Sequence, residues 1–417
     1  MKRYSYREVS TRVFATAPSF HRLFVTVATS TSALTTVSNM ASTAVTAMLI
    51  FGVSSLAGLA RVADLTLMLL PFNVSLVVQR TTLIQTIFGS GGSRRFHSAS
   101  RLSVVIGFIS VVSTCCLLVL VPGVSKILWV VPLGVLFLHI GDYYRYELFS
   151  LNRPRVSLLG DIILFSATLL GLIVSTQVEA EAFDILVLSW VGGSLVSVAV
   201  LASFRTVNSP LSEGRSRVLV GAVSIESALT LGAGQLLSLS LGLVVAKEAL
   251  GEFRLAQMSI SPLALISLSV VTSLAASPRA KNASVPAGCV ALLALAIGTL
   301  ILINPFAVMS RLGISQDDFS YVVMALGLAG AFSVSNNLKM IRLRPLFSDL
   351  RLWIVYRSSL SLLEPAVGLL LALQLGALGA ALGGFAHQVC LWFFLRRRSN
   401  IAETPGPVST ELRGIGS

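Results

Sequence analysis

The feature that most constrains this chain is a series of long uncharged stretches, each close to the length of a membrane crossing. The first runs from Leu23 to Ala60 without a single Asp, Glu, Lys or Arg. A helix needs about 20 mostly apolar residues to cross the hydrocarbon layer. Similar stretches follow as far as Arg396. This pattern predicts a helical membrane protein, because a transmembrane barrel would show short alternating segments instead.

The small fraction of charged residues supports the same interpretation. Only 12% of the 417 residues are charged, against roughly 25% in soluble proteins, and the mean hydropathy is +0.85. So little charge cannot give a soluble domain of this size a polar surface. The composition therefore excludes a cytosolic enzyme, a secreted disulfide scaffold and a disordered chain.

We predict an all-α polytopic protein with about twelve transmembrane helices, arranged as two parallel six-helix halves. The first uncharged stretch is expected to hold one span of about 25 residues and a short exit segment near 51–58. The further spans are predicted at 62–87, 102–125, 127–148, 156–178, 185–204, 218–246, 255–278, 284–308, 319–340, 352–375 and 376–395.

The basic residues alternate between the two sides of the membrane under this span count. Of the 31 Lys and Arg residues, 25 fall on one side and five on the other, while Arg357 lies inside a span. The rule that basic loops stay in the cytoplasm places both termini there. The net charge of +13 is explained by this topology, so no nucleic-acid partner is expected. The cytoplasmic arginines should attract anionic lipid headgroups.

No motif indicates a metal or a cofactor. The four cysteines lie in apolar stretches without a CxxC pair or a flanking histidine, which favours buried hydrophobic roles. The glycine-rich segment 89–95 follows no strand and lacks a GK[ST] sequence. We therefore expect no cofactor and no ATP-driven transport by this chain alone. The basic segment 1–22 does not have the pattern of a cleavable signal peptide.

A short internal repeat relates the two halves of the chain. Residues 58–63 and 251–256 both read G-x-x-R-(aliphatic)-A. Each copy is predicted to lie at the external turn between the first two spans of its half. The helix after each turn also contains a proline, Pro71 and Pro262. Proline kinks a transmembrane helix, and paired kinks in equivalent helices suit a transporter that rocks around a central site.

Three segments resemble one family of transporters. They are GEFRLAQMSISPLALISLSVV at 251–271, DYYRYELFSLNRP at 142–154 and LGALGAALGG at 375–384. They are similar to parts of the multidrug/oligosaccharidyl-lipid/polysaccharide exporter superfamily, in its polysaccharide (Wzx-like) flippase branch. The resemblance extends over residues 23–398. It implies a V-shaped pair of helix bundles that rock around a central cavity.

The resemblance also implies a function and a location. A flippase of this branch would move lipid-linked oligosaccharide outward across a bacterial plasma membrane. Its partners would be that substrate, the lipid bilayer, a coupling H⁺ or Na⁺ and a glycan polymerase. The domains expected are a cytoplasmic tail at 1–22, bundles at 23–205 and 218–398, a linker at 206–217 and a disordered tail at 399–417.

Arg61 and Arg254 occupy the same position of the internal repeat and are candidate substrate ligands. A guanidinium group binds phosphate oxygens in pairs and stays charged, which suits a polyprenyl pyrophosphate. The alternative is that both arginines only anchor helix ends at the membrane interface.

Arg357 and Glu364 share the eleventh predicted span. They are seven residues apart, so they lie on one face of a helix. A charged side chain inside the membrane must face protein or a water-filled cavity. Arg357 is a third candidate for substrate binding, and Glu364 is expected to face the cavity between the halves. The alternative is a structural ion pair. Pro365 should loosen the backbone beside Glu364.

Other intramembrane carboxylates are candidates for a coupling ion. Asp64 and Glu226 suit a proton or a sodium ion, while Asp161 suits either this role or an ion pair with Arg153 or Arg155. A structural role is the alternative for each. His139 and His387 are expected to be buried helix contacts, not parts of a proton relay.

Two other functions stay open. A cation-coupled multidrug exporter of the same fold would depend on the acidic residues more than on the arginines. A membrane glycan polymerase or glycosyltransferase would need catalytic residues in a sizeable external loop. The predicted external loops are short, so we expect a transporter and not an enzyme.

Overall fold

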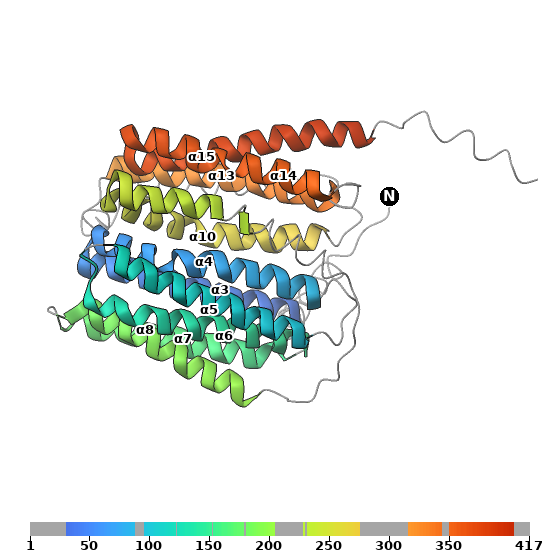
Figure 1. Ribbon diagram of the computed structural model, residues 1–417. Helices are drawn as coiled ribbons and strands as arrows, with labels where there is room; N and C mark the ends of the chain where they lie inside the picture. The colour runs from blue at the N-terminus through green and yellow to red at the C-terminus, as the bar shows by residue number, and fades with distance from the viewer. Residues whose placement is uncertain are drawn as a thin grey trace, which may run out of the picture.

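The computed structural model describes residues 31–87, 96–121, 123–151, 153–178, 181–204, 228–229, 232–275, 316–343 and 350–403. Every regular element within these ranges is helical. The helices run side by side in one bundle (Figure 1). Eight segments of the described residues are long and apolar enough to cross a membrane. The predicted all-α polytopic fold class is confirmed.

The N-terminal half matches the first six predicted spans. Its elements are α3 (Thr31–Ala57), α4 (Leu59–Ile87), α5 (Phe96–Leu120), the 3₁₀ helix η1 (Lys126–Val130), α6 (Val131–Ser150), α7 (Pro154–Ser175) and α8 (Ala182–Ser203). The predicted exit segment near 51–58 is wrong, because α3 continues unbroken to Ala57. The chain turns only at Gly58, whose φ of 81° is in the left-handed region that favours glycine at the end of a helix.

The C-terminal half is described in part. Its described elements are a helix at 232–240, the π-helical turn η3 (Leu241–Val245), α10 (Lys247–Ala275), α13 (Gln316–Leu343), α14 (Leu350–Ser361) and α15 (Leu363–Glu403). The predicted span 284–308, the linker 206–217 and the tail 1–22 lie outside the described residues. Helix α15 continues to Glu403, so the tail expected to be disordered from 399 begins within a helix.

Helix α15 is a hairpin of two antiparallel arms. The backbone reverses at Gly376, with φ 55° and ψ −130°, values that a residue with a side chain rarely adopts. The arms touch through glycine, because a Cβ on Gly383 would lie 2.3 Å from the Cα atom of Gly368. Small residues allow such close approach of membrane helices. The reversal falls at the predicted boundary between the spans 352–375 and 376–395.

The eleventh predicted span, 352–375, is interrupted near Pro365. Helix α14 ends at Ser361, Leu362 forms a turn, and α15 begins at Leu363. Pro365 has no N–H to donate to the carbonyl group of Ser361, four residues earlier. The expectation that Pro365 loosens this backbone is therefore confirmed.

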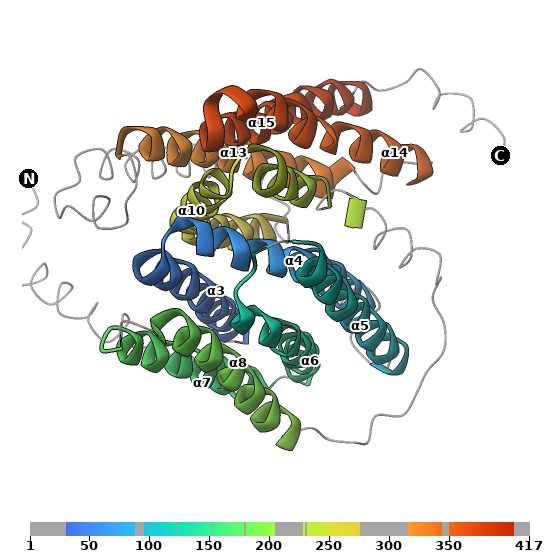
Figure 2. The same ribbon diagram turned by 60° about the vertical axis from the view of Figure 1, so that its left-hand side comes forward.

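The two halves meet through α4 and α10. Figure 2 shows α10 lying beside α3 and α4, between the rest of the C-terminal half and the N-terminal half. All residues from Val62 to Leu70 are buried, so the first part of α4 is surrounded by protein. At the start of both helices, a Cβ on Gly251 would lie 2.4 Å from the carbonyl oxygen of Leu59. The two repeat copies are therefore packed against each other.

The two repeat glycines have different local roles. Gly58 makes the turn before α4, whereas Gly251 lies one turn inside α10, which begins at Lys247. The expectation that both copies form a turn is correct only for the first copy. In the second copy the missing side chain permits the close contact with Leu59 instead.

The ends of the bundle differ in charge. We call the end that holds Arg145, Lys339 and Arg396 the basic end; it lies to the right in Figure 1. The opposite end holds the turns at Gly58 and Gly376. The sequence predicts that the basic end is cytoplasmic.

Candidate functional site

A polar cavity lies within the N-terminal half, and we call it the N-half cavity. Its volume is about 170 Å³, and α3, α4, α6, α7 and α8 form most of its wall. Met258 of α10 completes the wall, so the C-terminal half contributes as well. The polar lining residues are Ser42, Thr43, Thr46, Asn73, Arg80, Asp142, Arg145, Asp161, Ser194 and Ser197.

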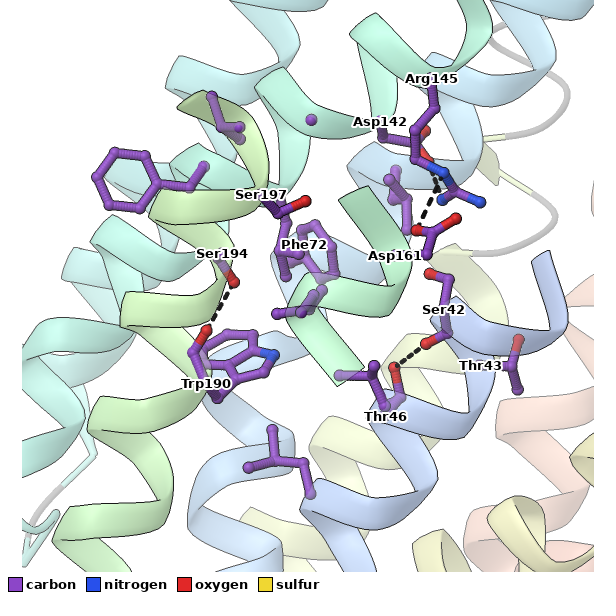
Figure 3. Close-up of a pocket in the computed structure, with 18 of the residues that line it drawn as sticks. Ser42, Thr43, Thr46, Phe72, Asp142, Arg145, Asp161, Trp190, Ser194 and Ser197 are labelled. Carbon is purple, nitrogen blue, oxygen red and sulfur yellow. Dashed lines mark hydrogen bonds and ion pairs between the residues drawn. The ribbon is translucent and has the colours of Figure 1, made fainter. Parts of the chain in front are cut away.

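The lining changes along the cavity. In Figure 3, Asp142, Arg145 and Asp161 gather at one end, while Trp190 and Thr46 lie toward the other. Ser194 donates a hydrogen bond to the carbonyl oxygen of Trp190 across 2.8 Å. The cavity thus combines a charged end with hydroxyl groups and an aromatic wall.

Two guanidinium groups and two carboxylates make a continuous network at the charged end. Arg80 Nη2 lies 2.7 Å from Asp142 Oδ1, and Arg145 Nη1 lies 3.2 Å from the same oxygen. Arg145 Nε then lies 3.3 Å from Asp161 Oδ1. Ser38 donates to Asp161 and accepts a hydrogen bond from Arg145 Nη2 across 3.1 Å. The network joins α3, α4, α6 and α7, and its formal charges balance.

Burial explains why these groups are paired. Asp142, Arg145 and Asp161 are each at most 5% exposed. A buried charge is stable only with a partner of opposite sign and further hydrogen bonds. Asp142 and Arg145 lie three residues apart on α6, so one face of this helix presents both. The charges of these residues are therefore already neutralised within the network.

Sequence reasoning missed this network. Arg80 and Arg145 fit the cytoplasmic side of the predicted topology as ordinary flanking residues, and Asp142 lies inside the predicted span 127–148. The proposed pairing of Asp161 with Arg153 or Arg155 is wrong, because Asp161 pairs with Arg145 and both alternatives are exposed. The signal available was Asp142-x-x-Arg145, which lies inside the segment that carries the family resemblance.

A second charged cluster joins the halves at the opposite end. Lys247 Nζ of α10 lies 2.6 Å from Asp64 Oδ1 of α4, and Arg61 Nη1 lies 3.4 Å from Asp64 Oδ2. The Asp64 side chain is 4% exposed. Two candidate residues, Arg61 and Asp64, are therefore brought together, and the carboxylate predicted to take a coupling ion already has two cationic partners.

Arg254 has different surroundings from Arg61, its counterpart in the repeat. Its Nη1 atom donates to Gln257 Oε1 across 3.0 Å. Gln257 occupies the repeat position of Asp64, so the second copy has an amide where the first has a carboxylate. The Nε atom of Arg254 is buried without a hydrogen-bond partner. Among the described residues, no carboxylate forms an ion pair with Arg254.

The candidates of the eleventh span lie on either side of its interruption. Arg357 is in α14 and Glu364 is in the first arm of α15. Glu364 Oε2 lies 3.2 Å from Nδ1 of His387 in the second arm. The same carboxylate faces Gly234 and Gly384, where an added Cβ would lie 3.5 Å and 3.7 Å from Oε1. Glu364 thus lies between the hairpin arms and the helix 232–240.

The remaining residues considered in the sequence are Glu226 and the two histidines His139 and His387. Glu226 lies outside the described residues. His139 is buried and satisfied at both ring nitrogens, by Ser75 at 2.8 Å and by the side chain of Gln79 at 2.9 Å. The expectation that His139 and His387 are buried helix contacts is confirmed. No group of three or more His, Cys, Asp or Glu residues that could hold a metal occurs in the part of the chain described.

Comparison with solved structures identifies the fold. An inward-facing multidrug resistance MATE family transporter of the MOP superfamily superposes with a TM-score of 0.62 at 11% identity, covering 89% of this chain and 96% of that one. The inward closed lipid II flippase MurJ gives 0.62 at 13% identity, covering 88% and 87%. The chain has the MOP transporter fold.

A third solved structure has the same fold. A MOP superfamily transporter from Pyrococcus furiosus superposes with a TM-score of 0.58 at 12% identity, covering 89% of this chain and 95% of that one. No family model and no curated protein matches the sequence. The predicted resemblance to the multidrug/oligosaccharidyl-lipid/polysaccharide exporter superfamily is confirmed at the level of fold. The chain is a multi-pass membrane protein of a transporter fold, and the polysaccharide flippase branch stays a prediction.

Proposed function

We propose that this protein is a flippase that moves a lipid-linked oligosaccharide, held on a polyprenyl pyrophosphate, from the inner to the outer leaflet by alternating access. We place it in a bacterial plasma membrane with both termini in the cytoplasm, as the basic residues predict. The lipid bilayer and the lipid-linked substrate are then its direct partners, and a glycan polymerase would act on the product.

The distribution of paired charges is the observation that carries this proposal. Asp64, Asp142 and Asp161 each already have a cationic partner. Arg254 has only a neutral partner among the described residues. A half-buried guanidinium whose Nε atom is buried without a hydrogen-bond partner is costly, and an anion such as pyrophosphate would relieve that cost. A cationic drug would instead need a carboxylate without such a partner, and these three buried carboxylates do not meet that need.

The neutral part of the N-half cavity fits the other end of such a substrate. Hydroxyl and amide groups can donate and accept hydrogen bonds, as sugar hydroxyl groups require. Ser42, Thr46, Asn73 and Ser197 supply such groups, and Trp190 supplies an aromatic surface. These features favour a glycan over an apolar drug.

Gene deletion tests the proposed substrate class. Without the protein, cells should lose one surface glycan while its lipid-linked repeat unit accumulates at the inner leaflet. Unpolymerised repeat units on the outer leaflet would support the polymerase alternative instead. Unchanged surface glycans and lipid-linked intermediates would reject the proposal.

The repeat offers a matched pair of variants for the anion site. Arg254→Gln should lower export per inserted molecule by about tenfold or more, the value of one charge-assisted hydrogen bond. Arg61→Gln should have a much smaller effect, because Asp64 keeps Lys247 as a partner. Equal losses in both variants would remove Arg254 from substrate binding.

A cation-coupled multidrug exporter is the second candidate. Similar folds include MATE multidrug transporters. Glu364 is 23% exposed and its Oε2 atom lies 3.2 Å from Nδ1 of His387, so this intramembrane carboxylate would suit a coupling H⁺ or Na⁺. Increased drug accumulation in deletion cells with normal surface glycans would support this alternative.

A further inference from the structure

The basic end of the C-terminal half contains an arrangement of cations around one tryptophan. Helix α13 and the second arm of α15 run in the same direction. Asn336 of α13 donates to both the backbone and the side-chain oxygen of Gln388, at 2.9 Å and 3.0 Å. These bonds fix the register of the two helices. One turn further along, Lys339 therefore reaches Trp392.

Two cations lie against the same indole ring. Lys339 Nζ is 4.7 Å from the Trp392 ring centroid, and the guanidinium carbon of Arg396 is 5.1 Å from it. Edge-to-face contacts with Phe332 and Phe393, at centroid distances of 6.0 Å and 5.0 Å, hold the ring in place. Tryptophan attracts cations to its face and commonly lies at the membrane interface.

The two cations repel each other in this arrangement. Lys339 lies beyond the apolar span that ends at Asn336. Burial and the nearby charge of Arg396 lower the pKa of Lys339 from its usual value. A bound anion would stabilise both charged groups together, because each oxygen of a phosphate accepts hydrogen bonds from cations.

We propose that Lys339 and Arg396, positioned by Trp392, bind the phosphate group of one anionic phospholipid at the membrane surface of the basic end. Phe393, beside this ring, is 60% exposed, so acyl chains would cover apolar surface next to the phosphate. This surface favours a lipid headgroup over free phosphate. The proposal does not depend on the transported substrate.

The site is tested with the full-length protein, purified in a neutral detergent. Native mass spectrometry measures the dissociation constant for phosphatidylglycerol. Lys339→Gln and Arg396→Gln should each weaken binding by about tenfold. The double variant should be little weaker than either single variant, because both cations bind one phosphate. Arg397→Gln, the neighbouring exposed arginine, is the matched control and should change binding by less than about threefold.

Three results would overturn the proposal. If Arg397→Gln weakens binding as much as Arg396→Gln does, the lipid is attracted by diffuse charge. If phosphatidylcholine binds as tightly as phosphatidylglycerol, the headgroup charge is not recognised. If inorganic phosphate at equal concentration displaces the lipid, and Lys339→Gln weakens phosphate binding equally, the site is one for free phosphate.

Discussion

Lys247 and Asp64 form an ion pair of 2.6 Å that joins the two halves of the protein. The pair lies at the end opposite the basic end, where Gly251 also packs against Leu59. A transporter that works by alternating access must separate its halves at this end when it opens outward. Under the proposed alternating-access function, the ion pair has to break in that step, so it should stabilise the state in which this end is closed.

Removing the pair should therefore favour opening at this end. Lys247→Ala leaves Arg61 as a partner for Asp64, whereas Asp64→Asn leaves two cations without one. We expect Asp64→Asn to cost the closed state about 1–3 kcal/mol and Lys247→Ala to cost less, since Lys247 is partly exposed. A cysteine at Leu59, in a background without the four native cysteines, reports the change through its reaction rate with an impermeant thiol reagent.

The control for this measurement is Lys126→Ala. Lys126 is exposed at the start of η1, and no ion pair involves it within the described chain. Its removal should leave the labelling rate unchanged. If Asp64→Asn labels no faster than the control, the ion pair does not hold this end closed.

The close contact of the repeat copies gives a second prediction. Gly251→Ala places a Cβ 2.4 Å from the Leu59 carbonyl oxygen, so α4 and α10 must move apart. Overpacking of this kind costs about 1–3 kcal/mol, and the thermal unfolding midpoint in detergent should fall. Gly192→Ala in α8 is the matched control, because its Cβ would meet no atom within 4 Å. Equal midpoints for the two variants would contradict this packing.

Topology is a third prediction. Single cysteines at 94–95, 215–217 and 342–344 should react only from the cytoplasm, and those at 179–184 and 247–252 only from outside. The uneven distribution of basic residues is the reason. The contact of Gly251 with Leu59 adds that a cysteine at Ala60 should react from the same side as 247–252. If 94–95 and 179–184 reacted from one side, the span count would be wrong.

Much of the fold could be predicted because one dominant physical constraint governs it. A membrane requires apolar spans of nearly constant length, so the spans and even the reversal at Gly376 follow from hydropathy and glycine. The helical position of Gly251 could not be predicted in the same way. The repeat motif shows that two positions are equivalent, but not which backbone conformation each one has.

The charge pairs were harder to predict than the spans. Arg80, Arg145 and Asp161 come from three different helices, and Arg80 is more than 60 residues from the other two in sequence. A basic residue near the end of a span resembles a topological anchor whether it faces lipid headgroups or a buried carboxylate. Only the packing of α4, α6 and α7 distinguishes the two roles. For the same reason the sequence alone does not show that Arg254 has the neutral partner Gln257 whereas Arg61 has the carboxylate of Asp64.

The buried network gives a fourth prediction. Arg145→Gln leaves Asp161 without its guanidinium partner, and breaking such a buried pair costs about 3–5 kcal/mol. The thermal unfolding midpoint should fall clearly, while Arg155→Gln, exposed on α7, should leave it nearly unchanged. The double variant Arg145→Met with Asp161→Leu removes both charges and should recover part of the lost stability. A double variant less stable than Arg145→Gln would show that the pair contributes net stability.

The last prediction concerns Glu364, whose carboxylate lies 3.2 Å from His387 between the arms of α15. Glu364→Gln removes the charge and keeps a side chain of the same shape, so the hairpin should still form. We expect Glu364→Gln and Arg357→Ala each to lower export per inserted molecule while the protein reaches the membrane at normal levels. Both residues carry charge within a span, where charge is retained chiefly for function or for an essential pair.

A purely structural role makes the opposite forecast. In that case both variants lower the amount of inserted protein, and the molecules that remain export normally. The measurement must therefore be transport per inserted molecule, with Arg397→Ala at the basic end as the control. His387→Ala separates the roles further: if the pair handles a coupling ion, this variant should reproduce the transport defect of Glu364→Gln. Normal export per molecule in all three variants would exclude this site from the transport mechanism and leave the fold assignment unchanged.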